Sequence, residues 1–305
     1  MTAAGVSVRA AMDRFLSSPR CSNQNTRRSY ATALEKWAEL IGAHRELGGV
    51  GEIEAADALT ELWGCSAPGT WNQRRASIAS FLTWCRKNAI PAPHLPESAE
   101  RRPDPADETR ALPQAEIERL LTRRDVPLRE KTLWRMLYET AARASEILAL
   151  NVDVLELDRR RAPVRSKGGA IEYVYWSTGT ARLLPRLIAG RAKGPLFLSE
   201  RRPVPARMPR AEDLCPETGL ARLGYDRARV LLDRYTSPGE GQPGWDLHQL
   251  RHSAATTLGE KGTALQLIMA KTRHRNPRTA MRYVKPGGQA VAEVTDLLDT
   301  APLRR

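Results

Sequence analysis

The sequence is poor in cysteine and has no long apolar run. Its four cysteines are scattered over 305 residues without a C-x-x-C pair, a pattern that favours neither a zinc site nor a disulfide framework. No apolar stretch reaches the roughly 18 residues of a membrane span, and the N-terminus has no signal-peptide pattern. We therefore expect a cytoplasmic protein that makes no use of a membrane, and we expect no metal or other cofactor.

Basic residues clearly outnumber acidic ones, but only in one part of the chain. The formal net charge is +13. Residues 1–100 carry 11 Lys and Arg against 10 Asp and Glu, whereas residues 101–305 carry 37 against 25. The positive charge therefore belongs to the second part. It indicates a polyanionic partner such as double-stranded DNA, bound in a salt-dependent way, although charge alone does not establish such binding.

The first hundred residues are typical of helices. Apolar residues recur at helical spacing over 25–41 and a glycine follows them, which predicts a helix there. A second helix is expected over 70–85. Each has a pair of arginines near its start, and these are candidates for contact with the DNA backbone or, equally, for solvated surface charge: Arg27, Arg28, Arg74 and Arg75.

The chain is long enough for two domains. A Pro-rich stretch at 91–96 and a charged run after it are typical of a linker. We expect a helical domain over 1–95, a linker over 96–111 and a second domain over 112–305.

A histidine and an arginine three residues apart begin a predicted helix. Asp246 and Gln249 have the spacing of a capping box, so the helix should start at Leu247 with His248 in its first turn. Backbone N–H groups at a helix start favour an anion, and the Arg251 fork suits phosphate oxygens. Taken alone, the pair is more typical of an ordinary surface.

A second histidine precedes a tyrosine by nine residues. On one continuous helix, His274 and Tyr283 would point to opposite faces. Pro277 resolves this, because it should end the preceding element and start a new helix with Asn276 as its cap. We expect Tyr283 near the end of that short helix.

Two further basic residues lie upstream. Glu146 follows Arg143 by three residues and is close enough to orient its guanidinium, and apolar residues after it indicate a buried context. Alternating β-formers over 171–176, after two glycines, predict a β-hairpin with Lys167 at its tip.

Together these segments resemble the tyrosine recombinase (phage integrase) family. The family's boxes read T-G-x-R-x-S-E-L, H-x-L-R-H, and L-G-H followed by a tyrosine about nine residues later. This chain departs from them at Ala141, where the family has Gly, and at Thr272-Arg273, where it has Leu-Gly. A less sharp bend is expected at Ala141.

The resemblance implies an α+β, mainly helical fold, in which a helical core-binding domain precedes a catalytic domain with a small β-sheet. Tyr283 would attack the scissile phosphate to give a 3′-phosphotyrosyl link, and Lys167 would protonate the departing 5′-oxygen. The arginines and His274 would hold the phosphoryl oxygens, with assistance from His248. The implied catalytic set is Arg143, Lys167, His248, Arg251, His274 and Tyr283, with Glu146 in support.

The implied function is site-specific recombination or integration of DNA, such as that of a mobile element. Two alternatives remain open: a type IB-like topoisomerase, and a non-catalytic DNA-binding protein on a recombinase scaffold. An apolar stripe from Ala290 to Leu298 could fold onto its own domain or dock on a neighbouring subunit. We expect a homo-oligomer, a tetramer, on double-stranded DNA.

Overall fold

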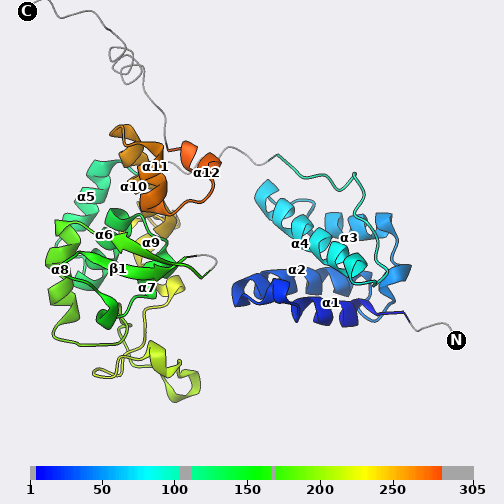
Figure 1. The fold of residues 1–305 in the computed structure, drawn as a ribbon, viewed down its shortest axis with the longest axis horizontal. Coiled ribbons are helices and arrows are strands. Elements are labelled where there is room, and N and C mark those ends of the chain that lie inside the picture. The colour runs from blue at the N-terminus through cyan, green and yellow to red at the C-terminus, as the bar shows by residue number, and fades with distance from the viewer. Residues whose placement is uncertain (1–4, 104–110, 167–168, 284–305) are drawn as a thin grey trace, which may run out of the picture. The chain divides into compact units, whose positions relative to one another are not determined.

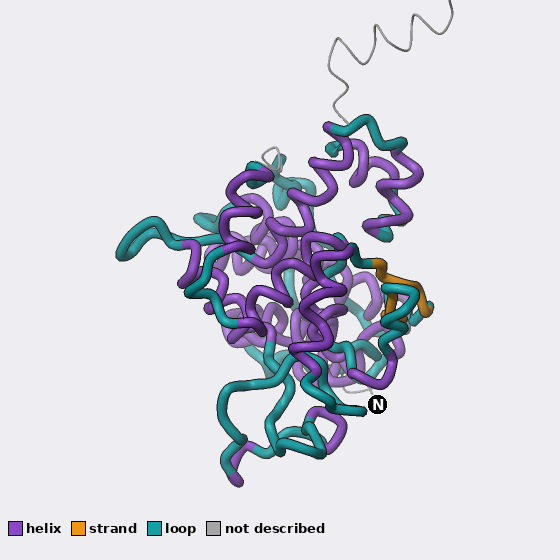
Figure 2. Tube along the Cα trace, turned by 90° about the vertical axis from the view of Figure 1, so that its left-hand side faces the viewer, coloured by secondary structure: helices purple, strands orange, loops and turns teal. Residues whose placement is uncertain are grey.

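Two groups of helices follow one another along the chain (Figure 1). The computed structural model describes residues 5–103, 111–166 and 169–283. Its contacts divide the chain into Met1–Glu108 and Thr109–Arg305. Helices dominate the described ranges and the named strands form a single hairpin (Figure 2), so the predicted fold class is confirmed. None of the helices in these ranges is both long and apolar enough to cross a membrane.

The N-terminal unit is a helical bundle around an aromatic centre. Phe81 lies edge-on to Phe15 and to Trp37, with ring centroids 5.6 and 6.3 Å away. Both predicted helices are confirmed, and the first of them ends at Gly42 with φ of 97°. The helices are α1 (Val8–Leu16), α2 (Gln24–Ile41), α3 (Glu52–Trp63) and α4 (Pro68–Lys87), with 3₁₀ turns at Pro19–Cys21 and Leu47–Gly49.

The start of the predicted linker packs on α4. Trp71 Nε1 donates to the Glu100 carbonyl over 2.8 Å, and the Arg75 guanidinium donates to the Ala99 carbonyl. The Arg102 guanidinium lies 4.1 Å from the centre of the Trp71 ring. Residues 99–102 therefore belong with the N-terminal unit, because long-range contacts hold a segment whose composition alone is that of a linker.

The C-terminal unit surrounds a buried central helix, α6. Trp134 and Leu137 of α6 are fully buried, and the helix packs against α8 and α10. Its helices are α5 (Gln114–Thr122), α6 (Leu128–Thr140), α7 (Ala144–Leu148), α8 (Thr178–Ile188), α9 (Tyr225–Thr236), α10 (Leu247–Glu260), α11 (Leu265–Thr272) and α12 (Pro277–Met281), with 3₁₀ turns at Val152–Val154, Pro205–Arg207 and Ala211–Asp213.

The predicted hairpin is confirmed. Strand β1 (Arg161–Arg165) pairs antiparallel with β2 (Ile171–Tyr175). Val164 and Val174 face the core, while alternate residues face solvent, as expected of a half-buried hairpin. Lys167, predicted at its tip, lies outside the described residues.

The helix ends near the predicted site follow local chemistry. Asp246 caps α10, accepting the N–H of His248, and Gln249 completes the capping box as predicted. The other boundary was misplaced. α11 ends at Thr272 through a left-handed Arg273 with φ of 57°, so Pro277 starts α12 but does not end α11.

Candidate active site

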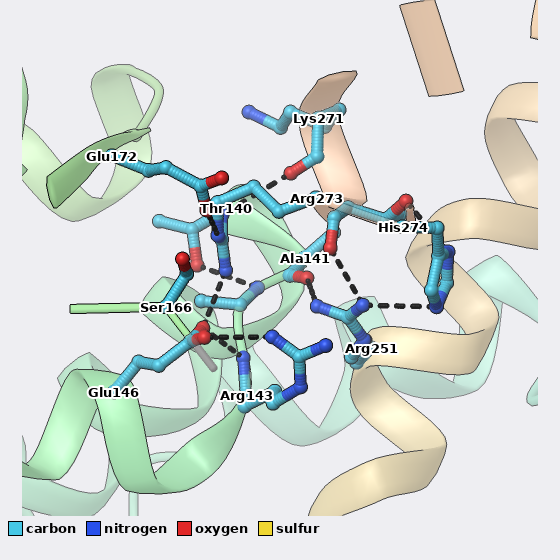
Figure 3. A network of polar contacts seen from close by, with 12 residues as sticks. Thr140, Ala141, Arg143, Glu146, Ser166, Glu172, Arg251, Lys271, Arg273 and His274 are labelled. Atoms are coloured by element: carbon cyan, nitrogen blue, oxygen red, sulfur yellow. Dashed lines mark hydrogen bonds and ion pairs between the residues drawn. The ribbon is translucent and has the colours of Figure 1, made fainter. Parts of the chain in front are cut away.

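The predicted side chains come from the ends of separate elements that meet in the C-terminal unit. Arg143 is the N-cap residue of α7, Arg251 lies in α10, and His274 follows α11. Figure 3 shows Arg251 between the other two side chains. Tyr283 lies two residues beyond α12 rather than within it. The structure thus brings four of the six predicted catalytic residues together.

Arg251 ties two of these elements to each other. Its side chain is almost fully buried, and its Nη1 and Nη2 donate to the carbonyls of Ala141 and Thr272, each over 2.6 Å. Burial, with the nearby charges of Arg143 and Arg273, lowers the pKa of Arg251 to about 10. The guanidinium is therefore still charged at neutral pH.

Both carbonyls that hold Arg251 lie at the end of an α-helix that stops at a residue with left-handed backbone angles. Ala141 closes α6 with φ of 50°, and Arg273 follows Thr272 with φ of 57°. These are the positions where glycine was expected, since glycine takes this conformation without penalty. The prediction of a less sharp bend at Ala141 is wrong: the turn forms with alanine in it.

His274 is held in a defined tautomer. The Thr272 hydroxyl donates to the Ile268 carbonyl over 2.7 Å, so its 2.8 Å contact with His274 Nδ1 needs the proton on Nδ1. Nε2 then accepts from Arg251 Nη2 over 3.0 Å. Burial, followed by the charges of Arg251 and Arg143, lowers the pKa of His274 to about 4, so the ring is neutral at pH 7.

Glu146 connects two arginines. Its Oε1 lies 2.8 Å from Arg143 Nη1, and its Oε2 accepts the Arg143 backbone N–H over 2.9 Å. Arg273 donates to the same Oε2 over 2.5 Å. Burial would raise the pKa of Glu146, but the charge of Arg273 and the hydrogen bonds hold it below its ordinary value. Glu146 therefore contacts both the backbone N–H and the guanidinium of Arg143, at the spacing noted in the sequence.

Tyr283 packs into this cluster through its ring. The ring stacks on His274 with centroids 5.8 Å apart and meets His252 edge-on at 5.1 Å. Tyr283 is 3% exposed, and among the described residues its hydroxyl has no hydrogen-bond partner. The phenol is thus placed beside the imidazole, and the described part of the chain leaves its hydroxyl without a hydrogen-bond partner.

His248 lies on the exposed side of the cluster, in the first turn of α10, and its charge contributes to lowering the pKa of His274. The hairpin that carries Lys167 is tied to the cluster by Lys271, whose Nζ donates to the Tyr175 carbonyl over 2.8 Å.

Sequence reasoning missed four residues that hold the cluster together: His252, Lys271, Thr272 and Arg273. The departure from the family's Leu-Gly pair marked Thr272 and Arg273, and the H-x-L-R-H box contained His252. Nothing in the sequence marked Lys271.

This arrangement can bind and attack a phosphodiester. Charged guanidinium groups hold phosphoryl oxygens and stabilise charge that develops on them, and an adjacent phenol supplies a nucleophile. Among the described residues, no three His, Cys, Asp or Glu side chains gather where they could hold a metal ion.

Comparison with known proteins identifies the family of this chain. The model of the phage integrase family matches residues 110–288, so the chain belongs to this family. Tyrosine recombinase XerC of Mycobacterium sp. strain JLS is 26% identical over 289 residues, which cover 91% of this chain and 93% of that protein. The chain is a tyrosine recombinase by family.

Solved structures share the fold. The Tn1549 transposon integrase in complex with transposon right end DNA gives a TM-score of 0.71 at 14% identity, covering 96% of this chain and all of the other (100%). A lambda integrase tetramer bound to a Holliday junction gives 0.68 at 14% identity, covering 92% and 78%.

Proposed function

We propose that this chain is a site-specific recombinase that cleaves and rejoins double-stranded DNA, with Tyr283 forming a 3′-phosphotyrosyl link. The observation that carries the proposal is the meeting of Arg143, Arg251, His274 and Tyr283, which come from four elements, in one cluster.

Arg143 and Arg251 divide the work of holding the scissile phosphate. Arg251 is fixed by two carbonyls, whereas Arg143 is fixed on one side by Glu146 and keeps its side chain 38% exposed. A phosphate that reaches Arg143 therefore meets two cations whose positions are set before it arrives. Such preorganised charge lowers the barrier because no reorganisation is needed as negative charge builds up.

His274 changes its role when the phosphate binds. Its ring is neutral because it is buried next to Arg251 and Arg143. A phosphate between the arginines offsets their charge and raises the pKa of His274. The imidazole can then be protonated on Nε2 and donate to a phosphoryl oxygen. It lies against the Tyr283 ring, so it also keeps the nucleophile beside the phosphate.

The remaining roles come from the family resemblance. Lys167 would protonate the departing 5′-oxygen, and His248, at the exposed start of α10, would assist by hydrogen bonding or proton transfer. In the N-terminal unit Arg27 and Arg28 are exposed and suited to the DNA backbone. Arg75 is committed to the Ala99 carbonyl, and Arg74 lies 6.0 Å from the Trp63 ring, which makes this pair weaker candidates.

The proposal implies assembly on DNA. Two sites must be held together for strand exchange, and we propose a homo-tetramer for this. The lambda integrase structure named above is a tetramer on a Holliday junction.

The test is covalent capture of DNA. Duplexes selected from random-sequence DNA by binding to the full chain are nicked near the cleavage position, so that the released strand diffuses away and the adduct accumulates. Wild type should give a gel-shifted adduct, and Tyr283→Phe should bind the duplex but give none, because only the nucleophilic oxygen is lost. An adduct in the mutant would refute the assignment of Tyr283.

Two outcomes would support the alternatives instead. Relaxation of supercoiled plasmid with no exchange between paired sites would indicate a topoisomerase. Tight binding by wild type without any adduct would indicate a non-catalytic DNA-binding protein.

A further inference from the structure

Arg273 is a buried cation that the proposed mechanism does not use. Its side chain is 4% exposed and lies between two carboxylates from different elements, Glu146 of α7 and Glu172 of β2 (Figure 3). Arg273 Nη2 donates to Glu146 over 2.5 Å, and Arg273 Nε lies 3.7 Å from Glu172 Oε2. Arg273 therefore joins the segment before His274 to both the Arg143 box and the hairpin.

The backbone at this position disfavours arginine. Its φ of 57° lies in the left-handed region, where glycine is the residue without strain. This strained residue directly precedes His274, and its side chain donates to the Lys271 carbonyl and to Glu146 and lies 3.7 Å from Glu172. The side chain, rather than the turn, is what arginine adds here.

Arg273 contacts Glu146, which is also the ion-pair partner of Arg143. Glu146 is 8% exposed and faces two guanidinium groups, Arg143 on one side and Arg273 on the other. Arg251 of α10 is close enough to be influenced by its charge, and Glu172 lies beyond Arg273. If Arg273 were absent, the buried Glu146 carboxylate would lose one of the two cations that keep it charged and in place, and Arg143 would lose its fixed partner more easily.

We propose that Arg273 is a positioning residue for DNA cleavage: it holds the Glu146 carboxylate in place, so that Glu146 in turn orients the Arg143 guanidinium toward the phosphate. The proposal rests on the proposed function. Arg273 does not touch the phosphate in this scheme but acts through Glu146.

The experiment compares Arg273→Gly and Arg273→Lys with wild type and with Arg160→Gly. Arg160 is a matched control, because it is also an arginine in the left-handed conformation (φ of 50°), with an exposed side chain that contacts Thr178 rather than Glu146. For each protein, adduct formation on the nicked duplex is measured in single turnover at saturating protein from pH 5 to 9, and Kd for the same duplex is measured separately.

Arg273→Gly should slow adduct formation about 10-fold or more, as loss of a group that orients a site residue does elsewhere, with little change in Kd. Its acid limb should also move to higher pH. Arg273 lowers the pKa of Glu146, so without it Glu146 is protonated sooner as pH falls and releases Arg143. Arg273→Lys should restore part of the rate and return the limb toward that of wild type. Arg160→Gly should cleave as wild type does.

Glu146→Gln separates positioning from a general structural effect. In that background Arg273→Gly should no longer move the acid limb, because the group that titrates is gone. The proposal is overturned if Arg273→Gly cleaves like wild type at every pH, or if its rate falls equally at every pH whether Glu146 is present or not. If Arg273→Gly does not fold, Arg273→Gln, which removes the charge and keeps most of the side chain, takes its place, and a rate and acid limb of Arg273→Gln that match wild type overturn the proposal.

Failure of the proposed function looks different from failure of this inference. In that case wild type itself forms no adduct. Failure of the inference leaves wild type active and the Arg273 variants indistinguishable from it.

Discussion

Arg143 and Arg251 lie side by side but differ in how much of the structure depends on them. Arg251 is buried and satisfies the carbonyls of Ala141 and Thr272, whereas Arg143 is partly exposed and satisfies only Glu146 among the described side chains. A buried carbonyl left without a partner costs about 1–3 kcal/mol. The two residues should therefore respond differently to truncation.

We expect Arg143→Ala to slow adduct formation on the order of 10²-fold or more, as loss of other transition-state donors does, with little change in thermal unfolding. Arg251→Ala should lose at least as much activity and also unfold at lower temperature. Single-turnover cleavage and calorimetry check both.

Cleavage by wild type should proceed in excess EDTA, because the arginines supply the positive charge. A strict requirement for Mg²⁺ in the chemical step would contradict this assignment.

His274 should make stability depend on pH. Its pKa of about 4 in the fold lies below the ordinary value of about 6.5, so the unfolded chain binds a proton more readily between these values. The stability from a neutral His274 is fully present above about pH 6.5 and is lost as pH falls toward 4. Carboxylates titrate there too, so the measurement is a difference. The melting temperature of wild type should fall more steeply with decreasing pH than that of His274→Gln. Equal slopes would contradict the burial of a neutral ring.

Among single residues, the sequence predicted those that belong to motifs with a fixed spacing. Arg251, His274 and the Glu146–Arg143 pair were predicted from boxes and intervals, and the structure brings them together. The supporting contacts of Thr272 and Arg273 were not predicted, because they depend on which distant carbonyl or carboxylate lies opposite, and separations such as the 127 residues between Arg273 and Glu146 leave no local pattern.

Helix ends decide where the site residues lie. α6, α8 and α11 all end in a non-glycine residue with left-handed φ, and Ala189 after α8 is the exposed example (φ of 50°). Left-handed backbone costs an L-residue about 1–2 kcal/mol, part of which glycine loses again through its more flexible unfolded chain.

We expect Ala189→Gly to stabilise the C-terminal unit by about 0.5–1 kcal/mol, measured by urea unfolding. Arg182→Gly, in the interior of the same helix at an exposed position, is the control and should destabilise by about 1 kcal/mol. At Ala141, which is fully buried, the same change should gain less, because a buried methyl group is lost. A destabilising effect of Ala189→Gly would mean that the turn is not strained.

Helix boundaries were predictable where a capping residue or a proline marks them, and were missed where none does. The capping box of Asp246 and Gln249 gave the start of α10 to the residue, and Pro277 gave the start of α12. The end of α11 at Thr272 was missed because Arg273 is not a residue that signals a left-handed turn. Tyr283 follows the end of α12, and its ring stacks on His274.

For the whole molecule, the distribution of charge predicted which part of the chain holds the candidate site. The excess of positive charge after residue 100 falls in the unit that holds the candidate site, as a DNA-cleaving unit requires. Composition was a poorer guide to where the first unit ends. Ala99 is buried and Arg102 stacks on Trp71. Such contacts join residues that are far apart in the sequence, and the composition of a charged, Pro-rich stretch does not predict them.

The apolar stripe from Ala290 to Leu298 lies outside the described residues, so its expected docking on a neighbouring subunit rests on the sequence. Burial of apolar surface contributes roughly 25 cal/mol per Å², which would favour association once DNA has brought subunits together. Wild type should then be mainly monomeric in solution and form higher-order complexes on DNA that carries paired sites.

Truncation after Gly288 tests this, because it removes the stripe and keeps Tyr283. The truncated protein should bind a single site nearly as well as wild type and still form the covalent adduct on a nicked duplex, but it should assemble and recombine paired sites poorly. A matched variant that replaces Leu297 and Leu298 with Ser, at full length, should show the same separation if apolar burial rather than chain length is responsible. Normal synapsis by both proteins would mean that the stripe packs within its own subunit.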